Sequence, residues 1–214
     1  EPDFWTPIRN SLIVAGATTA VSVVLGAFCA YALARLQFRG KALMLTFVLA
    51  VSMFPQIAIV SPLYLLLRTA GLLNTYPGLV LPYLTFAMPL TIFLLVGFFR
   101  QIPIELEEAA FMDGAGRLRA LREIVLPLAS PAIATTAILT FLYSWNEFLF
   151  ALSFSLGPER HTVPVSIALF RGQYQVPWGQ ILAAAVVATA PAGAIVLLAQ
   201  RRIIAGLTSG AVKG

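Results

Sequence analysis

Charged residues are scarce in this chain. Asp, Glu, Lys and Arg together make up 11% of its 214 residues, whereas 59% are hydrophobic. A soluble domain carries roughly 25% charged residues, so this chain has too little polar surface to cover a water-soluble globule. Its apolar runs are long and do not alternate with polar residues, which excludes a transmembrane β-barrel and leaves membrane-spanning helices.

Cysteine and histidine are nearly absent as well, with Cys29 and His161 the only examples. One cysteine excludes a disulfide framework within the chain, and the two lone residues supply too few ligands for a zinc site. A phosphate-binding loop is also missing, because Gly40-Lys41 is followed by Ala42 and has no upstream glycine at the required spacing. The sequence therefore predicts no metal and no nucleotide cofactor bound by this chain.

Apolar sequence of membrane-spanning length is abundant. A spanning helix needs roughly 20 mainly apolar residues. Five segments meet this requirement, namely 11–34, 42–67, 78–99, 131–153 and 181–200. The second and third contain internal prolines, which remove a backbone donor and favour kinks. The predicted fold is an all-α polytopic helical bundle that forms one membrane domain over residues 1–214.

The basic residues indicate which way this bundle faces. Ten of them follow the first, third and fifth spans, and four lie on the other side of the membrane. The side richer in Lys and Arg faces the cytoplasm. We therefore expect a cytoplasmic loop at 100–127, a cytoplasmic tail at 201–214 and an external loop at 154–180. An external start without a leader further predicts one more N-terminal helix, six spans in all.

Membrane orientation accounts for all the basic residues, so the sequence predicts no nucleic-acid partner.

The acidic residues gather in the loop at 100–127, which holds five of the nine acidic residues in the chain. Pro103 and the acids that follow it favour a helix start, and Gly114 and Gly116 favour a break. A second helix at 117–124 would then end at Pro127. This helix–turn–helix either presents charge to a soluble partner or lies on lipid headgroups, and a DNA-binding role fits its acidic first helix poorly.

The spacing within this loop matches a family signature. Glu108-Ala109-Ala110 is followed at fixed intervals by Gly114, Ile124 and Leu126-Pro127. This pattern resembles the "EAA" signature of the permease subunits of bacterial ABC importers. Segments along the whole chain, such as SWNEF at 144–148, resemble carbohydrate-type permeases, and the tail at 206–214 resembles their maltose/trehalose-like branch.

The resemblance implies that the loop helix docks in a cleft of an ATPase subunit. The residues it assigns to this contact are Glu107, Glu108, Ala109, Ala110, Met112, Asp113, Gly114, Leu126 and Pro127. Two ATPase subunits would bind ATP and Mg, so this chain itself would be no enzyme. Further implied partners are a second homologous permease, an external sugar-binding protein, membrane lipid and a mono- or oligosaccharide cargo. Transport would proceed by alternating access across a bacterial or archaeal cell membrane.

Polar residues on the spans are candidates for the sugar path. They are Gln56, Tyr64, Tyr83, Asn146 and Glu147. An intramembrane carboxylate is a functional candidate by default. Glu147 would lie about 24 Å along a helix that starts near Pro131, close to the outer face. There it would either border the mouth of the path or pair with a neighbouring subunit.

The predicted external loop at 154–180 supplies the last candidate contacts. By the same resemblance, Gln173, Tyr174 and Trp178 form a tip that reaches the sugar-binding protein. Alternatively, Tyr174 and Trp178 are aromatic anchors at the membrane interface.

Two other functions stay open on the residues alone. An ion-coupled secondary transporter needs intramembrane charges, of which only Glu147 is available. A membrane scaffold without transport needs none. Both leave the spaced motif at 108–127 unexplained.

Overall fold

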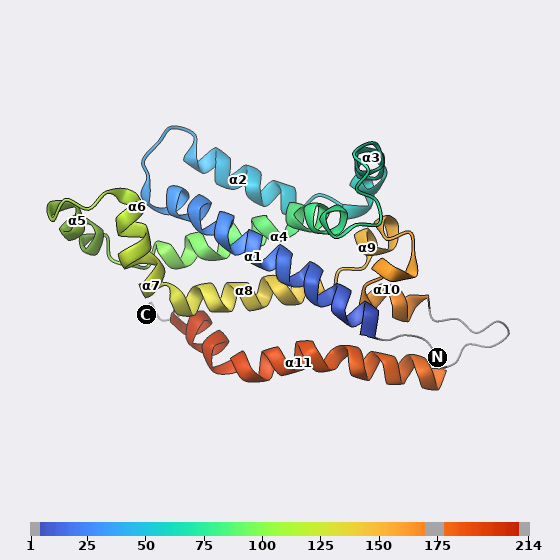
Figure 1. Ribbon diagram of the computed structural model, residues 1–214. Helices are drawn as coiled ribbons and strands as arrows, with labels where there is room; N and C mark the ends of the chain where they lie inside the picture. Colours follow the sequence, from blue (N-terminus) through green and yellow to red (C-terminus); the bar gives the residue numbers. More distant parts are fainter. Residues whose placement is uncertain (1–4, 170–177, 210–214) are drawn as a thin grey trace.

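The long helices of this protein lie side by side in one bundle. The computed structural model describes residues 5–169 and 178–209, and every regular element in these ranges is a helix (Figure 1). Helices α1 (Trp5–Arg35), α4 (Tyr76–Phe99) and α8 (Ser130–Trp145) pack against one another, and α11 (Trp178–Ser209) packs against α8. The predicted all-α membrane fold is confirmed.

Two of these helices, α1 and α4, are long and apolar enough to cross a membrane unbroken. The predicted span at 42–67 is instead a bent pair, α2 (Lys41–Ser52) and α3 (Gln56–Thr69), which meet at 91°. The span at 131–153 is also divided, because α8 ends at Trp145 and α9 (Leu149–Phe154) follows as a separate helix. A 78° bend also separates the helical stretch Arg117–Leu128 from α8. Counting each bent pair as one span gives up to four spans among the described residues, beside a shorter apolar stretch, Ile181–Ala194, in α11.

Proline explains one of these breaks. Pro55 adopts an extended backbone (φ −66°, ψ 119°) at the start of α3, and it has no N–H to continue α2. Pro82 and Pro89, by contrast, lie inside α4, which remains one helix. A proline in an apolar segment therefore marks a place where a span can break, and packing decides whether it does.

Helices α1, α4 and α8 meet along a seam of small and hydroxyl-bearing residues. The fully buried hydroxyls of this seam belong to Thr18, Ser22, Thr91, Thr136 and Thr140. The hydroxyls of Thr91 and Thr140 lie 2.9 Å apart and share a hydrogen bond. Gly26 continues the seam, and a Cβ there would lie only 2.8 Å from Cγ2 of Thr91. Such residues let membrane helices approach closely.

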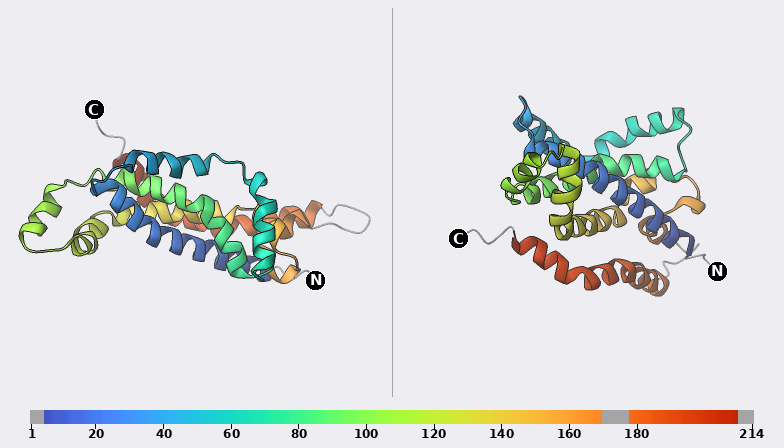
Figure 2. Two further views of the ribbon diagram at one scale, coloured as in Figure 1. Left: turned by 90° about the horizontal axis from the view of Figure 1, so that it is seen from above. Right: turned by 60° about the vertical axis from the view of Figure 1, so that its left-hand side comes forward.

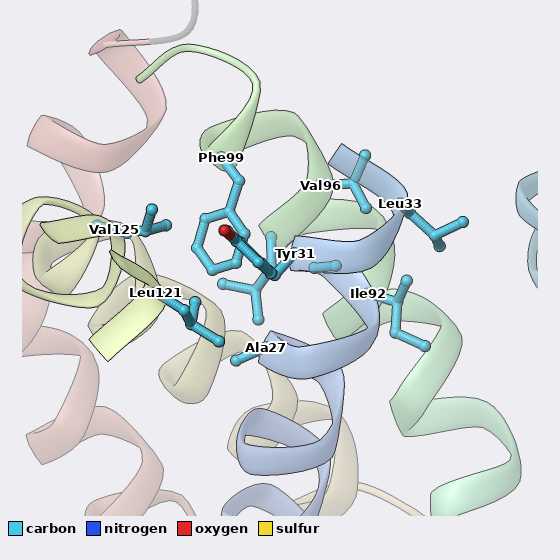
Figure 3. Close-up of a cluster of buried hydrophobic side chains, with 11 residues drawn as sticks. Ala27, Tyr31, Leu33, Ile92, Val96, Phe99, Leu121 and Val125 are labelled. Atoms are coloured by element: carbon cyan, nitrogen blue, oxygen red, sulfur yellow. The ribbon is translucent and has the colours of Figure 1, made fainter. Parts of the chain in front are cut away.

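Apolar clusters fill the bundle at both ends of the seam. At the end next to α5 (Glu105–Met112), Tyr31 of α1 and Phe99 of α4 pack against Leu121 and Val125 of the π-helix η1 (Leu121–Val125), as Figure 3 shows. At the opposite end, residues of α3, α4 and α9 pack with α10 (Val163–Ala168). We call these the α5 end and the α9 end. The short helix η2 (Pro158–Arg160) also contacts α1.

The contact at Gly26 makes a testable prediction about stability. Gly26→Val should lower the stability of the bundle by about 1–3 kcal/mol, because the added methyl groups overpack the α1–α4 interface. Thermal unfolding of the protein in detergent measures this effect. Gly16→Val is the matched control, since a Cβ at Gly16 meets nothing within 4 Å. Equal melting temperatures for the two variants would contradict the prediction.

Candidate functional site

The loop at 100–127 projects from the α5 end as two short helical segments (Figures 1 and 2). Helix α5 is followed by α6 (Arg117–Ala120), which continues through η1 into α7 (Leu126–Leu128). The turn between α5 and α6 depends on Gly114, whose φ of 82° lies in the left-handed region that favours glycine. Gly116 has φ −80° and ψ 166°, which any residue adopts.

Most of the predicted docking residues on α5 and its turn face outward. Glu108, Ala109, Asp113 and Gly114 are exposed, and Met112 is exposed over 89% of its surface. Ala110 is half-buried. The exposed face thus combines two carboxylates with a large apolar side chain, and methionine is enriched where proteins contact one another.

Glu107 belongs to the same predicted set but faces inward. Its side chain is 2% exposed, and Oε1 lies 2.5 Å from Nε of Arg35. The Tyr31 hydroxyl donates a hydrogen bond of 2.8 Å to Oε2 of Glu107. Arg35 in turn donates through Nη2 to the carbonyl oxygen of Ile102 at 2.6 Å. Glu107 is therefore not available for direct contact with a partner.

The remaining two residues of the predicted set, Leu126 and Pro127, lie beyond η1. Leu126 packs against the apolar cluster at the α5 end. Its N–H bonds to the carbonyl oxygen of Leu121 in a π-helical turn. Pro127 is exposed and lies one residue before the end of the helical stretch Arg117–Leu128, so this stretch ends at Leu128, one residue beyond the predicted end.

A second group of predicted residues meets at the α9 end. Here Gln56, Asn146 and Glu147 line an open cavity of about 570 Å³ together with Leu142, Tyr143, Phe148 and Leu149. The Gln56 side chain donates through Nε2 to the Tyr143 hydroxyl at 2.9 Å. The structure therefore brings together three of the five predicted path residues and adds Tyr143, a polar aromatic that the sequence did not single out.

The carboxylate of Glu147 is held by its own chain. It accepts hydrogen bonds from the backbone N–H groups of Phe150, at 2.9 Å, and Ala151, at 3.1 Å. Both groups lie in the first turn of α9, where helix geometry provides no backbone acceptor. Glu147 thus caps α9 at the edge of the cavity, a role that neither sequence alternative included.

The other predicted path residues do not line this cavity. Tyr83 is buried, with its hydroxyl 3.5 Å from the carbonyl oxygen of Glu147. Tyr64 packs against the apolar cluster at the α9 end. Of the predicted binding-protein contacts, Trp178 is the first residue of α11 and is 68% exposed. Gln173 and Tyr174 lie outside the described residues.

A polar cluster that the sequence did not reveal fixes the start of α1. The buried Asn10 donates to the carbonyl oxygens of Glu159 and His161, at 3.0 and 2.9 Å, and accepts from the Tyr76 hydroxyl at 2.8 Å. Asn74 donates to the Glu159 carboxylate and thereby holds the pKa of that exposed carboxyl below its usual range. The only sequence signal for this cluster is an asparagine, Asn10, directly before the predicted span at 11–34.

The same fold occurs in solved structures of ABC transporters. The chain superposes with a TM-score of 0.76 on a bacterial ABC transporter involved in the import of alginate, at 24% identity over 94% of this chain and 75% of that one. A methionine ABC transporter in an inward-facing conformation gives a TM-score of 0.68, at 19% identity over 96% of this chain and 98% of that one.

Sequence comparison identifies the family. Residues 22–209 match the family model described as "Binding-protein-dependent transport system inner membrane component", and the chain belongs to this family. It is 50% identical to a trehalose transport system permease protein of Mycobacterium tuberculosis (strain CDC 1551 / Oshkosh), over 99% of this chain and 78% of that protein. It is 44% identical to a trehalose/maltose transport system permease protein of Thermococcus litoralis, over 97% and 75%. The resemblance to sugar ABC permeases is confirmed, and the chain is a multi-pass membrane protein.

The turn at Gly114 can be tested directly. Gly114→Val should cost about 1–2 kcal/mol locally, because a side chain with Cβ is strained at positive φ. The loosened turn should speed tryptic cleavage after Arg117 and Arg119. Limited proteolysis of the detergent-solubilised protein measures this cleavage rate. Gly116→Val is the control, since its backbone is extended. Cleavage at the same rate in both variants would show that the turn does not depend on Gly114.

Proposed function

We propose that this chain takes up sugar with energy that an ATPase delivers to the exposed face of α5. The observation that carries the proposal is this face, formed by Glu108, Ala109, Met112 and Asp113, at the free end of a membrane bundle. This face combines carboxylates with exposed apolar side chains, a combination that suits contact with another protein. The family membership supports an ATPase and a binding protein as partners in general.

In the proposed assembly the α5 end faces the cytoplasm and meets one of two ATPase subunits, which bind ATP and Mg. The bundle pairs with a second, homologous permease subunit. An external sugar-binding protein delivers cargo at the α9 end. Helix α11 begins near α10, at the α9 end (Figure 1), and its first residue, Trp178, is exposed. This exposure supports a contact with the binding protein through Gln173, Tyr174 and Trp178.

The cavity at the α9 end supports a sugar as the cargo. Its volume of about 570 Å³ is within the usual range of small-molecule sites, roughly 300–1,000 Å³. Aromatic rings of Tyr143 and Phe148 offer faces for a sugar ring, and the amides of Gln56 and Asn146 offer donors and acceptors for hydroxyls. The names of the two relatives make a trehalose- or maltose-like disaccharide the favoured cargo.

Alternating access would use the bends of the bundle. The α2–α3 pair bends by 91° beside the cavity residue Gln56, and the loop stretch Arg117–Leu128 meets α8 at 78°. Discontinuous helices of this kind flank substrate sites in other transporters. Movement of α5 would reach α8 through the second bend, and closure of the ATPases would thereby reshape the cavity.

Reconstitution of the full complex in proteoliposomes tests the function. Uptake of labelled trehalose and maltose should require ATP and persist when ion gradients are collapsed. Glu108→Lys should abolish most uptake while the protein still inserts, because it reverses a charge on the docking face. Glu123→Lys is the control, an exposed acid of the same loop outside this face. Gradient-dependent uptake, or full uptake with Glu108→Lys, would refute the proposal.

The cavity assignment has its own test. Gln56→Leu removes one hydrogen-bonding group and should raise the KM for sugar about fivefold, since one such bond contributes about 1 kcal/mol. The measurement is the concentration dependence of uptake, and ATP hydrolysis should change little. Gln101→Leu, at an exposed site in the loop at 100–127, is the matched control. An unchanged KM for the Gln56 variant would remove Gln56 from the path.

A further inference from the structure

The ion pair of Glu107 connects two parts of the molecule that are far apart in sequence. Arg35 closes α1, and Glu107 lies in the first turn of α5. The pair is almost fully buried, and both partners are further fixed, Glu107 by the Tyr31 hydroxyl and Arg35 by the carbonyl of Ile102. A buried pair with these extra hydrogen bonds resists separation, because either charge left alone would be unpaired away from water.

Apolar packing strengthens the same connection. Below its hydroxyl, the ring of Tyr31 packs among Phe99, Leu121 and Val125 (Figure 3). Tyr31 of α1 therefore contacts α5 through its hydroxyl group, and the same side chain contacts η1 through its ring. The last turns of α1 thus hold both halves of the loop at 100–127.

The far end of α1 is equally well fixed. Asn10 bonds to two carbonyl oxygens around η2, and the Ser11 hydroxyl accepts a 2.8 Å hydrogen bond from the N–H of Val163 at the start of α10. Between Asn10 and Arg35 the helix rises roughly 38 Å. Because α1 is one continuous helix, a displacement at Arg35 would reach the α9 end along it.

We propose that Arg35, Glu107 and Tyr31 form a mechanical joint that makes α5 and α1 move as one lever. The inference rests on the proposed function and deepens it. An ATPase stroke received at Glu108 then enters the bundle through α1, beside the chain route through α6 and η1 into α8. Glu107 acts as a positioning residue of this joint, and the neighbouring Glu108 makes the outward contact.

The experiment uses the complete reconstituted complex. The double variant Arg35→Gln/Glu107→Gln removes both charges together, so that neither is left buried alone. We expect ATPase subunits to co-purify in wild-type amounts and ATP hydrolysis to persist. Sugar transported per ATP hydrolysed should fall about tenfold, within the usual range for coupling between sites. The control is Arg119→Gln/Glu123→Gln, which removes an exposed ion pair of 2.9 Å from the same loop and should leave this ratio unchanged.

Two milder variants keep the test valid if the double variant does not fold. Tyr31→Phe removes one hydrogen bond, and Arg35→Lys keeps the charge but cannot hold both Glu107 and the Ile102 carbonyl. Each should lower the ratio about fivefold, since each loses one hydrogen bond of about 1 kcal/mol. A wild-type ratio in all the variants that fold overturns the joint. Loss of ATPase co-purification also overturns it, because Glu107 would then only shape the docking face.

A distance measurement tests the lever itself. Spin labels at Leu106→Cys and Phe28→Cys, both exposed sites outside the docking face, would report the separation of α5 and α1 after Cys29 is replaced by serine. One unchanged distance with and without ATP supports the lever, and a nucleotide-dependent distance overturns it. A wild-type complex without ATP-driven sugar uptake would refute the proposed function, and the joint with it.

Discussion

The close approach of α1, α4 and α8 is the constraint on which the rest of the structure depends. Lipid is as apolar as leucine, so the hydrophobic effect does little to bring membrane helices together. The helices instead gain from tight packing and from hydrogen bonds between hydroxyls, such as the one that joins Thr91 and Thr140. Gly26 permits the contact because it has no side chain. The apolar clusters at both ends of the bundle assemble on these three helices.

The sequence predicted the elements that depend on hydropathy and local backbone chemistry. Helices α1 and α4 follow from unbroken apolar runs, and the turn at Gly114 follows from the freedom of glycine. Of the breaks in the other spans, only the one at Pro55 has a sequence signal. The end of α8 at Trp145 has no proline or glycine beside it. Asn146 and Glu147 follow, and the carboxyl group of Glu147 supplies the cap that starts α9. Such a cap is a tertiary detail that hydropathy does not encode.

The candidate site was only partly visible in sequence for a related reason. Glu107 and Glu108 are chemically identical neighbours, and a motif treats them alike. On a helix, however, adjacent side chains point about 100° apart, so one faces the bundle and the other faces out. The inward partner, Arg35, lies 72 residues earlier, where the sequence indicates only a role in membrane orientation. No sequence pattern singles out Tyr143 as a path residue; only the folded structure places its hydroxyl beside Gln56.

The cap at Glu147 has a consequence for selectivity by charge. Glu147 is the only acidic or basic residue among the described residues that line the cavity, and its two carboxyl oxygens accept hydrogen bonds from backbone N–H groups of α9. An anionic cargo would therefore find no cation in this lining, and a cationic one would compete with the helix for its counter-ion. The lining therefore offers a cargo no cation and no carboxyl group free of backbone hydrogen bonds, which suits an uncharged solute recognised by its shape and its hydroxyl groups.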